Sequence, residues 1–400
     1  MEENVLREAK SLQKELVRYR RYLHAHAELG FAMTQTLPFV ERALRGMGYT
    51  PQKCGKAGLL ATVGRPSGKT VLLRADMDGL PIREETGLPF ACKEGNMHAC
   101  GHDMHTAMLL GGAKLLKDRE KELNGCVKLL FQPAEEILEG AADVLKSGVL
   151  RAPKPQAAMM LHVMTGGKLP TGVAVVASGG VSAPAADYFT IGVRGKGCHG
   201  STPHKGVDGL LAAAHIAIAL QEISTRELPA AEPHALTIGS FKTGEGGNVI
   251  CDYAELNGTL RAFDEEVRLF LKKRIAEVAD CTAKAFRATA KTEFSGGCPT
   301  LVNDGELSDF TATTLQNLLG KDKAFSAAAF GDRKTEMGGS EDFAYISHKL
   351  PSVMVALGAG EKGEGHEYPL HHPKAKFDEG ALCIGSAIYA QFAIEWLKRK

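Results

Sequence analysis

The segment NMHACGHDMH, residues 96–105, holds three of the fourteen histidines of the chain together with a cysteine and an aspartate. Cys100 and His102 flank one glycine, so a turning backbone can direct both side chains to the same side. A thiolate and an imidazole are ligands that suit zinc and similar transition metals. The segment therefore indicates a metal site, although a catalytic thiol or a satisfied polar cluster would use the same residue types.

Glu135 and Glu136 are adjacent carboxylates in QPAEE, directly after an apolar stretch that Pro133 ends. Neighbouring side chains point in different directions, so one glutamate can bind a metal while the other accepts a proton from water. A bound metal lowers the pKa of water toward neutrality, and the carboxylate then completes its activation. The start of a helix, where acidic residues are favourable, would explain the same pair.

Three further polar candidates stand where apolar segments end or loops begin: Asp78 in RADMD, His162 in LHV and His371 in PLHHP. Ligands of open α/β sheets bind at the carboxyl ends of the strands, so these groups are expected to converge at one edge. His199 lies apart from them, in the glycine-rich segment GKGCHGSTPH. Taken singly, His162 is also typical of a hydrogen-bonded core residue. His199 and His371 are also typical of ordinary loops and turns.

Apolar patterning places these candidates among alternating strands and helices. Buried strands are predicted over 58–64, 69–78, 125–132 and 157–163. Between and around them, helices are predicted up to about Leu23 and over 37–47, 105–123 and 143–149. This alternation favours an α/β domain with a mostly parallel sheet covered by helices on both faces.

The pattern changes near Ala186. Helices over 208–222 and 265–288 accompany about four strands that are apolar on one face, which predicts a separate small α+β domain. After residue 298 the chain is expected to return to the first domain, with a buried strand in PSVMVALGAG and a final helix over 378–397. The predicted limits are 1–185 and 298–400 for the first domain and 186–297 for the inserted one.

Composition narrows the class of protein further. The 400 residues carry a formal net charge of +1 without a basic or acidic block, which argues against a nucleic-acid partner. Nine cysteines without paired spacing favour a reducing compartment over a disulfide framework. The N-terminus reads as an amphipathic helix, and the apolar run 210–220 is too short to span a bilayer. We therefore expect a cytoplasmic location and no membrane partner.

A set of motifs occurs in the order known from one enzyme family: LRADMDGLPIRE, MHACGHDMHTAMLLGGA, LLFQPAEE…GA, GCHGSTPH, NVI…GTLRAFD, GSEDFAY and LHHP. The chain resembles the aminoacylase and carboxypeptidase-G type of dinuclear metallopeptidase. Within that family it resembles the amidohydrolase branch of N-acyl-L-amino acid amidohydrolases, hippurate hydrolases and auxin-conjugate hydrolases. The resemblance covers nearly the whole chain, and HACGHDMHTA followed by QPAEE is its most specific part.

The resemblance implies a catalytic α/β domain interrupted by a ferredoxin-like lid, through which the enzyme forms a homodimer. It implies two divalent metal ions, which are zinc, manganese, cobalt or nickel in the family, and no other cofactor. By motif match the ligands would be Cys100, His102, Glu136, His162 and His371. The Cys100 thiolate would be shared between the two ions.

The resemblance also implies roles for other residues. Glu135 would be the general base and later the proton donor to the leaving amine. Asp78 would support the site from its strand end, and His199 would stabilise the oxyanion from the lid, within one chain or across the dimer. Within the segment 96–105, Asp103 and His105 are then expected to be supporting residues at the start of a helix, and His98 has no assigned role.

The implied reaction is hydrolysis of an N-acyl-L-amino acid to a carboxylic acid and a free amino acid. The acyl group stays open between aromatic acyl, acetyl, indole-acetyl and aminobenzoyl, and a dipeptidase or an aminobenzoyl-glutamate hydrolase of the same family is an alternative. Two alternatives come from other classes of protein. One is a cysteine hydrolase with Cys100 as nucleophile and His102 or His105 as base, and the other is a catalytically silent metal-dependent binding protein. The amidohydrolase is favoured because it alone explains the two glutamates together with the distant histidines.

Overall fold

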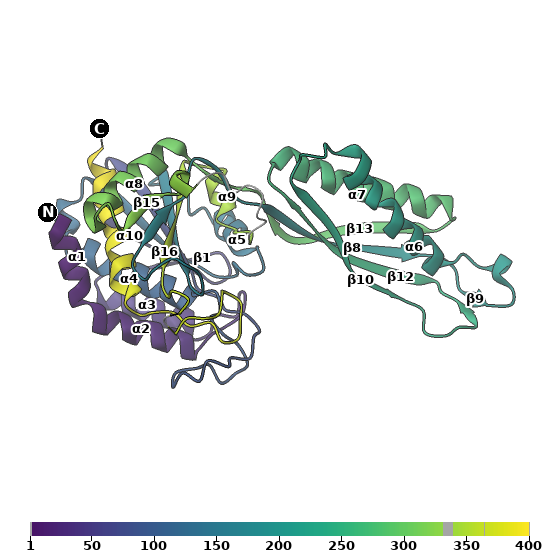
Figure 1. Ribbon diagram of the computed structural model, residues 1–400, viewed down its shortest axis with the longest axis horizontal. Coiled ribbons are helices and arrows are strands. Elements are labelled where there is room, and N and C mark those ends of the chain that lie inside the picture. Colours follow the sequence, from purple (N-terminus) through teal and green to yellow (C-terminus); the bar gives the residue numbers. More distant parts are fainter. Residues whose placement is uncertain (1, 331–338, 364, 400) are drawn as a thin grey trace. The chain divides into compact units, whose positions relative to one another are not determined.

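The computed structural model describes residues 2–330, 339–363 and 365–399 (Figure 1). Within these residues the chain divides into two compact units. The first unit combines residues 2–182, 302–330 and 342–399, and the second holds residues 183–301 and 339–341. Among the helices that the structure describes, none combines the length and the apolar character needed to cross a membrane.

An eight-stranded sheet forms the centre of the first unit, in the order β1-β2-β4-β3-β5-β16-β6-β15. Its central strands β4, β3, β5 and β16 are parallel to one another, whereas β1, β2 and β6 introduce antiparallel pairs. The strands are β1 Gln52–Cys54, β2 Gly58–Gly64, β3 Lys69–Asp76, β4 Gly125–Gln132, β5 Ala157–Met164, β6 Ala174–Val176, β15 Ala324–Ser326 and β16 Ser352–Gly358. The predicted mostly parallel sheet is therefore confirmed.

Helices cover this sheet because its central strands are apolar on both faces. Every residue of β4 is buried, as expected for a parallel strand between two helical layers. The helices of the unit are α1 Glu2–Ser11, α2 Gln13–Ala25, α3 Thr36–Gly46, α4 His102–Lys117, α5 Gly140–Lys146, α8 Gly305–Leu319, α9 Ala344–Ser347 and α10 Ala381–Lys398. The single N-terminal helix predicted from the sequence is thus two helices, α1 and α2.

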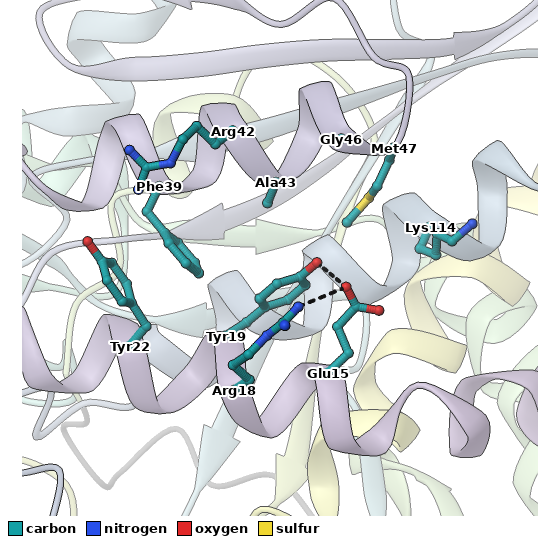
Figure 2. A pocket seen from close by; sticks show the side chains of 10 residues that line it. All are labelled: Glu15, Arg18, Tyr19, Tyr22, Phe39, Arg42, Ala43, Gly46, Met47 and Lys114. Carbon is teal, nitrogen blue, oxygen red and sulfur yellow. Dashed lines mark hydrogen bonds and ion pairs between the residues drawn. The ribbon is translucent and has the colours of Figure 1, made fainter.

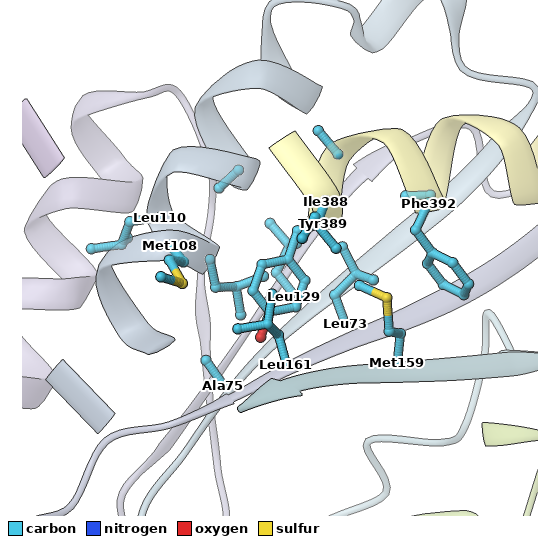
Figure 3. Packing of buried hydrophobic residues seen from close by; sticks show 14 of the residues in the cluster. Leu73, Ala75, Met108, Leu110, Leu129, Met159, Leu161, Ile388, Tyr389 and Phe392 are labelled. Carbon is cyan, nitrogen blue, oxygen red and sulfur yellow. The ribbon is translucent and has the colours of Figure 1, made fainter. Parts of the chain in front are cut away.

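The core of the first unit lies where α4 and α10 pack together on the sheet (Figure 3). Met108 of α4 and Phe392 of α10 are fully buried together with Leu129 of β4. Burying one such side chain stabilises the fold by about 1.5–3 kcal/mol. The two helices approach closely at Gly111, where a side-chain carbon would lie 2.2 Å from Oγ of Ser386. This packing fixes α4, whose first residue is His102, against the strand ends.

The second unit is a four-stranded antiparallel sheet in the order β10-β12-β8-β13, with the helices α6 and α7. The chain order β-α-β-β-α-β together with this strand order is that of a ferredoxin-like fold. Its elements are β8 Ala185–Arg194, α6 Gly209–Ala219, β10 His234–Thr243, β12 Tyr253–Ala262, α7 Glu265–Ala285 and β13 Thr289–Cys298. The predicted inserted α+β class is confirmed.

Two short pairs of strands complete the strands of the described residues. They are β7 with β14 and β9 with β11. Their bounds are β7 Gly180–Ala183, β14 Leu301–Asn303, β9 Cys198–His199 and β11 Val249–Ile250.

Candidate active site

The carboxyl ends of β3, β4 and β5 bring most of the predicted residues to one edge of the sheet. Asp78 follows β3, Glu135 and Glu136 follow β4, and His162 stands near the end of β5. Because these three strands are parallel neighbours, their ends meet at the same edge. His371 joins them from the loop after β16, where its backbone N–H donates to the carbonyl of Ala99 at 3.0 Å.

Cys100 lies at the centre of the candidate ligands. Its Sγ is 3.5 Å from Nε2 of His162 and 3.2 Å from Nε2 of His371. The carboxylate of Glu136 is 3.6 Å from Nε2 of His371 and 3.7 Å from Nε2 of His102. Two groups of donor atoms, each within 4.8 Å of one another, therefore share the thiol: Cys100 with His102 and His162, and Cys100 with Glu136 and His371.

Several of these donor atoms are buried without a partner among the described residues. Both ring nitrogens of His102 and Oε1 of Glu136 make no hydrogen bond. Each such atom costs about 1–3 kcal/mol unless something binds it. A thiolate, imidazoles and a carboxylate in one cluster are the donors that zinc and related transition metals accept. The residues present therefore fit a metal centre.

Burial determines the protonation of these groups. It lowers the pKa of His162 to about 3, so the ring is neutral, and Nδ1 donates to the carbonyl of Val163 at 2.8 Å. Nε2 of His162 therefore presents its lone pair toward Cys100. Burial raises the pKa of the Cys100 thiol far above its usual value, to which the Glu136 carboxylate adds, and it raises the pKa of Glu136 to about 7. Both acidic groups thus need a nearby cation to ionise fully at neutral pH.

The turn that carries the two glutamates has a strained backbone. Ala134 and Leu138 adopt φ angles of 60° and 56°, a region that residues other than glycine rarely use. The carboxylate of Asp78 accepts hydrogen bonds from the N–H groups of Glu135 at 3.0 Å and Glu136 at 3.1 Å. Asp78 thus holds the turn in a conformation that directs both glutamates toward the ligand cluster, and strain of this kind gathers at functional sites.

Gly101 allows Cys100 and His102 to serve one centre. Its φ of 86° is in the left-handed region, and α4 begins directly after it. A side-chain carbon at this position would lie 2.4 Å from Cγ2 of Val163. Only glycine fits both the conformation and the space.

Asp76 is a buried carboxylate that the sequence analysis did not select. Its Oδ1 accepts a hydrogen bond from Nδ1 of His105 at 2.6 Å, and its Oδ2 accepts one from Arg74 at 2.6 Å. Nε2 of His105 accepts the N–H of Val163 at 2.8 Å, beside His162. Asp76 therefore orients His105, which in turn holds the strand end that carries a candidate ligand. The signal in the sequence was a second aspartate in RADMD, two positions before Asp78 and at the end of a predicted buried strand.

Asp103 and His98 belong to the same segment 96–105 and are both buried. Oδ2 of Asp103 accepts hydrogen bonds from Nε of Arg20 at 2.7 Å and from Nδ1 of His24 at 2.8 Å, which ties α2 to the start of α4. His98 is buried, and neither of its ring nitrogens has a hydrogen-bond partner within the described part of the chain. Burial lowers the pKa of His98 to about 4, so its ring is neutral.

His199 is the one predicted site residue that belongs to the second unit. It is exposed and lies in β9, which pairs with β11. Its Nδ1 accepts the backbone N–H of Ser201 at 3.1 Å and lies 2.7 Å from the hydroxyl of the same serine. Nε2 is therefore the nitrogen through which this ring would contact a substrate, and its role stays a prediction.

A hollow of about 530 Å³ lies elsewhere in the first unit, between α2 and α3 (Figure 2). Its only carboxylate, that of Glu15, accepts a hydrogen bond from the hydroxyl of Tyr19 and lies 3.5 Å from the guanidinium of Arg18. None of the candidate ligands lines it. The candidate active site is therefore the ligand cluster at the strand ends and not this hollow.

Known proteins with related sequences are enzymes that act on amide bonds. The sequence profile of Peptidase family M20/M25/M40 matches residues 72–395. N-acetylcysteine deacetylase of Bacillus subtilis is 36% identical over 96% of this chain and 97% of its own length. IAA-amino acid hydrolase ILR1-like 2 of Arabidopsis thaliana is 32% identical over 96% of this chain and 86% of its own length.

A solved structure of the same family has the same fold. The YXEP protein of Bacillus subtilis, a dinuclear metal binding peptidase from the M20 family, matches with a TM-score of 0.77 and 32% identity. The match covers 97% of this chain and 99% of that protein. The chain thus belongs to Peptidase family M20/M25/M40, and it is a metal-dependent hydrolase that acts on amide bonds, as its sequence predicts.

Proposed function

We propose that this protein hydrolyses the amide bond of N-acyl-L-amino acids to a carboxylic acid and a free amino acid. The position of Glu135 is the main support for this proposal. Glu135 is buried beside the ligand cluster, and its Oε2 lies 3.9 Å from Nε2 of His102. The printed names of two relatives, a deacetylase of N-acetylcysteine and a hydrolase of IAA-amino acids, support the substrate class.

The candidate ligands would hold two divalent ions. Two overlapping groups of donors that share the Cys100 thiol support a centre that would hold two ions, and the YXEP relative is itself a dinuclear metal binding protein. The ligands would be Cys100, His102, Glu136, His162 and His371. The mixture of sulfur, nitrogen and oxygen favours zinc or a related transition metal. When bound, such ions acidify water and polarise an amide carbonyl.

The residues of the chain then have distinct tasks. Glu135 accepts the proton of the attacking water and passes it to the nitrogen of the leaving amino acid. Asp78 keeps the backbone of Glu135 in place, so that this carboxylate does not have to be ordered during each turnover. His199 donates a hydrogen bond from Nε2 to the developing oxyanion. One such donor lowers the activation free energy by about 3–4 kcal/mol.

The cysteine hydrolase is not favoured by the surroundings of Cys100. Its thiol is buried, and burial together with nearby carboxylates raises its pKa far above the usual value. A nucleophilic cysteine needs the opposite environment, with a lowered pKa and access to solvent.

A homodimer through the second unit is supported by its surface. β10 is an edge strand of the four-stranded sheet, and such an edge is a template for pairing with another chain. Leu211 and Ile218 of α6 and Phe241 of β10 are exposed apolar residues of the same unit. An isologous contact between two copies of this unit would cover exposed apolar side chains of this kind.

A release assay tests the proposed function. Protein loaded separately with zinc, manganese, cobalt or nickel is given N-acyl amino acids varied on each side of the amide, together with dipeptides and aminobenzoyl-glutamate. We expect turnover of N-acyl amino acids, loss of activity with a chelator, and a loss of about 10²–10⁴-fold in kcat for Glu135→Gln with its metals bound. Near-normal turnover by that variant would contradict the assignment. Activity that survives a chelator and is removed by a thiol alkylator would identify a cysteine hydrolase.

A further inference from the structure

The motif GSEDFAY, residues 339–345, has no task in the mechanism given above. Its Asp342 belongs to the first unit and is fully buried two residues before α9. The helix α9 packs on α5, which begins where the turn with the two glutamates ends (Figure 1). A buried carboxylate is costly unless hydrogen-bond donors surround it, so the partners of Asp342 indicate what this residue does.

Donors from both sides of the turn converge on the carboxylate of Asp342. Nη2 of Arg74 donates to Oδ1 at 2.9 Å, and the backbone N–H of Ala141 donates to Oδ2 at 2.7 Å. Nε2 of Gln132 lies 2.8 Å from Oδ1 and 3.0 Å from Oδ2. Gln132 ends β4 just before the turn, and Ala141 is in the first turn of α5 just after it. One carboxylate therefore joins the two ends of the turn.

The two ends of the turn also lie close to each other. The N–H of Gly140 donates to the carbonyl of Ala134 at 3.0 Å. A side-chain carbon on Gly140 would lie 1.7 Å from the carbonyl oxygen of Pro133. Asp342 thus binds a compact segment, and a shift of its carboxylate would move the turn that carries both glutamates.

Asp342 also contacts the proposed general base. Its backbone N–H donates to Oε1 of Glu135 in a long hydrogen bond of 3.4 Å, although the two residues are 207 positions apart in the chain. Oε2, the other oxygen of that carboxylate, lies 3.9 Å from Nε2 of His102, a candidate ligand. The two oxygens of Glu135 therefore have different neighbours.

Arg74 places a positive charge between two carboxylates. It donates from Nη1 to Asp76 at 2.6 Å and from Nη2 to Asp342 at 2.9 Å, and all three side chains are fully buried. Charges interact more strongly inside a protein than in water, and removal of one partner leaves the other unpaired. The side chain of Asp342 is therefore held firmly, and its backbone N–H is held with it.

We propose that Asp342 is a positioning residue for Glu135. Its N–H holds Oε1, so that Oε2 takes the proton of the attacking water while the water oxygen bonds to the amide carbonyl carbon. Oε2 then gives this proton to the amide nitrogen as the C–N bond breaks. The inference rests on the proposed function, in which Glu135 is the general base. A base that is ordered before the substrate binds does not have to be ordered during the reaction.

The test is Asp342→Asn in the metal-loaded enzyme. The amide has nearly the shape of the carboxylate but lacks its charge and one of its acceptor oxygens. We expect kcat on the best N-acyl amino acid to fall about 10–100-fold, with a smaller change in KM, because Oε1 of Glu135 is less firmly held. The rates are measured at saturating Zn²⁺, with the metal content of each protein determined.

A double-mutant cycle separates the positioning of Glu135 from a general defect. In the Glu135→Gln background the base is already lost, so Asp342→Asn should lower the residual single-turnover rate by less than about twofold. A defect in folding or in metal binding would instead lower the rate by the same factor in both backgrounds. That result would overturn the inference.

Glu28→Gln is the matched control, because it removes another buried carboxylate of the first unit that accepts a backbone N–H at the start of a helix. It should leave kcat as it is. If Asp342→Asn does not fold, Gln132→Met removes one donor to the same carboxylate and should lower kcat by about threefold to tenfold. An unchanged kcat in the variant that folds would overturn the inference.

The activity of Glu135→Gln shows which of the two proposals fails. If that variant loses activity while Asp342→Asn keeps it, only the inference is wrong. If Glu135→Gln keeps near-normal turnover, the assignment of the general base fails, and the inference fails with it.

Discussion

Nδ1 of His105 donates a hydrogen bond to Oδ1 of Asp76 at 2.6 Å, and both side chains are fully buried beside the candidate ligands. Burial alone would raise the pKa of Asp76, but His102, Arg74 and His105 hold it well below its usual range. Asp76 is therefore an ionised carboxylate that fixes the tautomer and the orientation of the His105 ring. A carboxylate behind an imidazole of this kind is typical of the surroundings of metal ligands.

The first prediction concerns this pair. In Asp76→Asn and in His105→Ala, the affinity for Co²⁺ or Zn²⁺ should fall about 10–100-fold, because the strand end that carries His162 loses its support. Metal affinity is measured by calorimetry or by competition with a chromophoric chelator. Glu28→Gln is the matched control, since it removes another buried carboxylate of the same unit that does not touch the ligands. An unchanged metal affinity in both site variants would contradict the prediction.

The second prediction concerns Asp78. Its oxygens Oδ1 and Oδ2 accept the N–H groups of Glu135 and Glu136, and in asparagine one of these two positions becomes an NH₂ group, which cannot accept. We expect Asp78→Asn to lower kcat by about 10²-fold with a smaller change in KM, because the general base is less well positioned. Steady-state kinetics on the best substrate of the panel gives both values. A rise in KM at constant kcat would instead assign Asp78 to substrate binding.

The third prediction concerns the dependence of stability on pH. The carboxylate of Glu28 accepts hydrogen bonds from the N–H groups of Thr34, Gln35 and Thr36 at the start of α3. Burial alone would raise the pKa of Glu28, but a hydrogen bond from the Thr34 hydroxyl at 2.6 Å, together with these backbone bonds, lowers it below its ordinary value of 4.5. Because the pKa of Glu28 is lower in the folded than in the unfolded protein, its carboxylate stabilises the fold fully at pH values above the unfolded-state pKa. This stabilisation is lost as the pH falls through the folded-state pKa.

Glu28→Gln should therefore lower the free energy of unfolding by about 1–3 kcal/mol at neutral pH. Its stability should also fall less steeply than that of the unsubstituted protein when the pH drops below about 4.5. Urea denaturation at several pH values measures both effects. The same pH dependence in the two proteins would show that Glu28 does not contribute to it.

The fourth prediction concerns the proposed dimer. Ile218 of α6 is 70% exposed, and a carboxylate at this position would lose its hydration in an apolar contact without gaining a partner. Ile218→Glu combined with Phe241→Glu should shift the protein from dimer to monomer in analytical ultracentrifugation, at concentrations where the unsubstituted protein is dimeric. Leu269→Glu, on α7 of the same unit, is the control and should leave the mass unchanged. A monomeric unsubstituted protein would contradict the dimer itself.

The class of fold and the class of enzyme could be predicted from the sequence because both depend on local signals. Buried strands such as 125–132 alternate with helices along residues 37–163, and each of these elements is visible in a short window of the sequence. The motifs HACGHDMHTA and QPAEE carry the family resemblance in a few consecutive residues. The boundary between α1 and α2 was missed because the apolar pattern continues across Leu12, although the helix does not.

The order of the strands could not be predicted in this way. β4 lies between β2 and β3 in the sheet, and β16 lies beside β5 although almost two hundred residues separate them in the chain. Such pairings depend on which apolar faces pack together, and no short segment contains that information.

The residue types at the candidate site were thus determined by the sequence alone: one cysteine, several histidines and paired carboxylates, with a chemistry that suits a metal-dependent hydrolase. Only the tertiary structure decided which carboxylate supports which group. Asp76 and Asp78 are two positions apart, yet the first binds His105 of α4 and the second binds the turn at Glu135, 57 positions further along the chain. The physical reason is that a hydrogen bond needs a partner within about 3 Å. Packing of α4 on the sheet brings His105 to Asp76, whereas pairing of β3 with β4 brings the turn at Glu135 to Asp78.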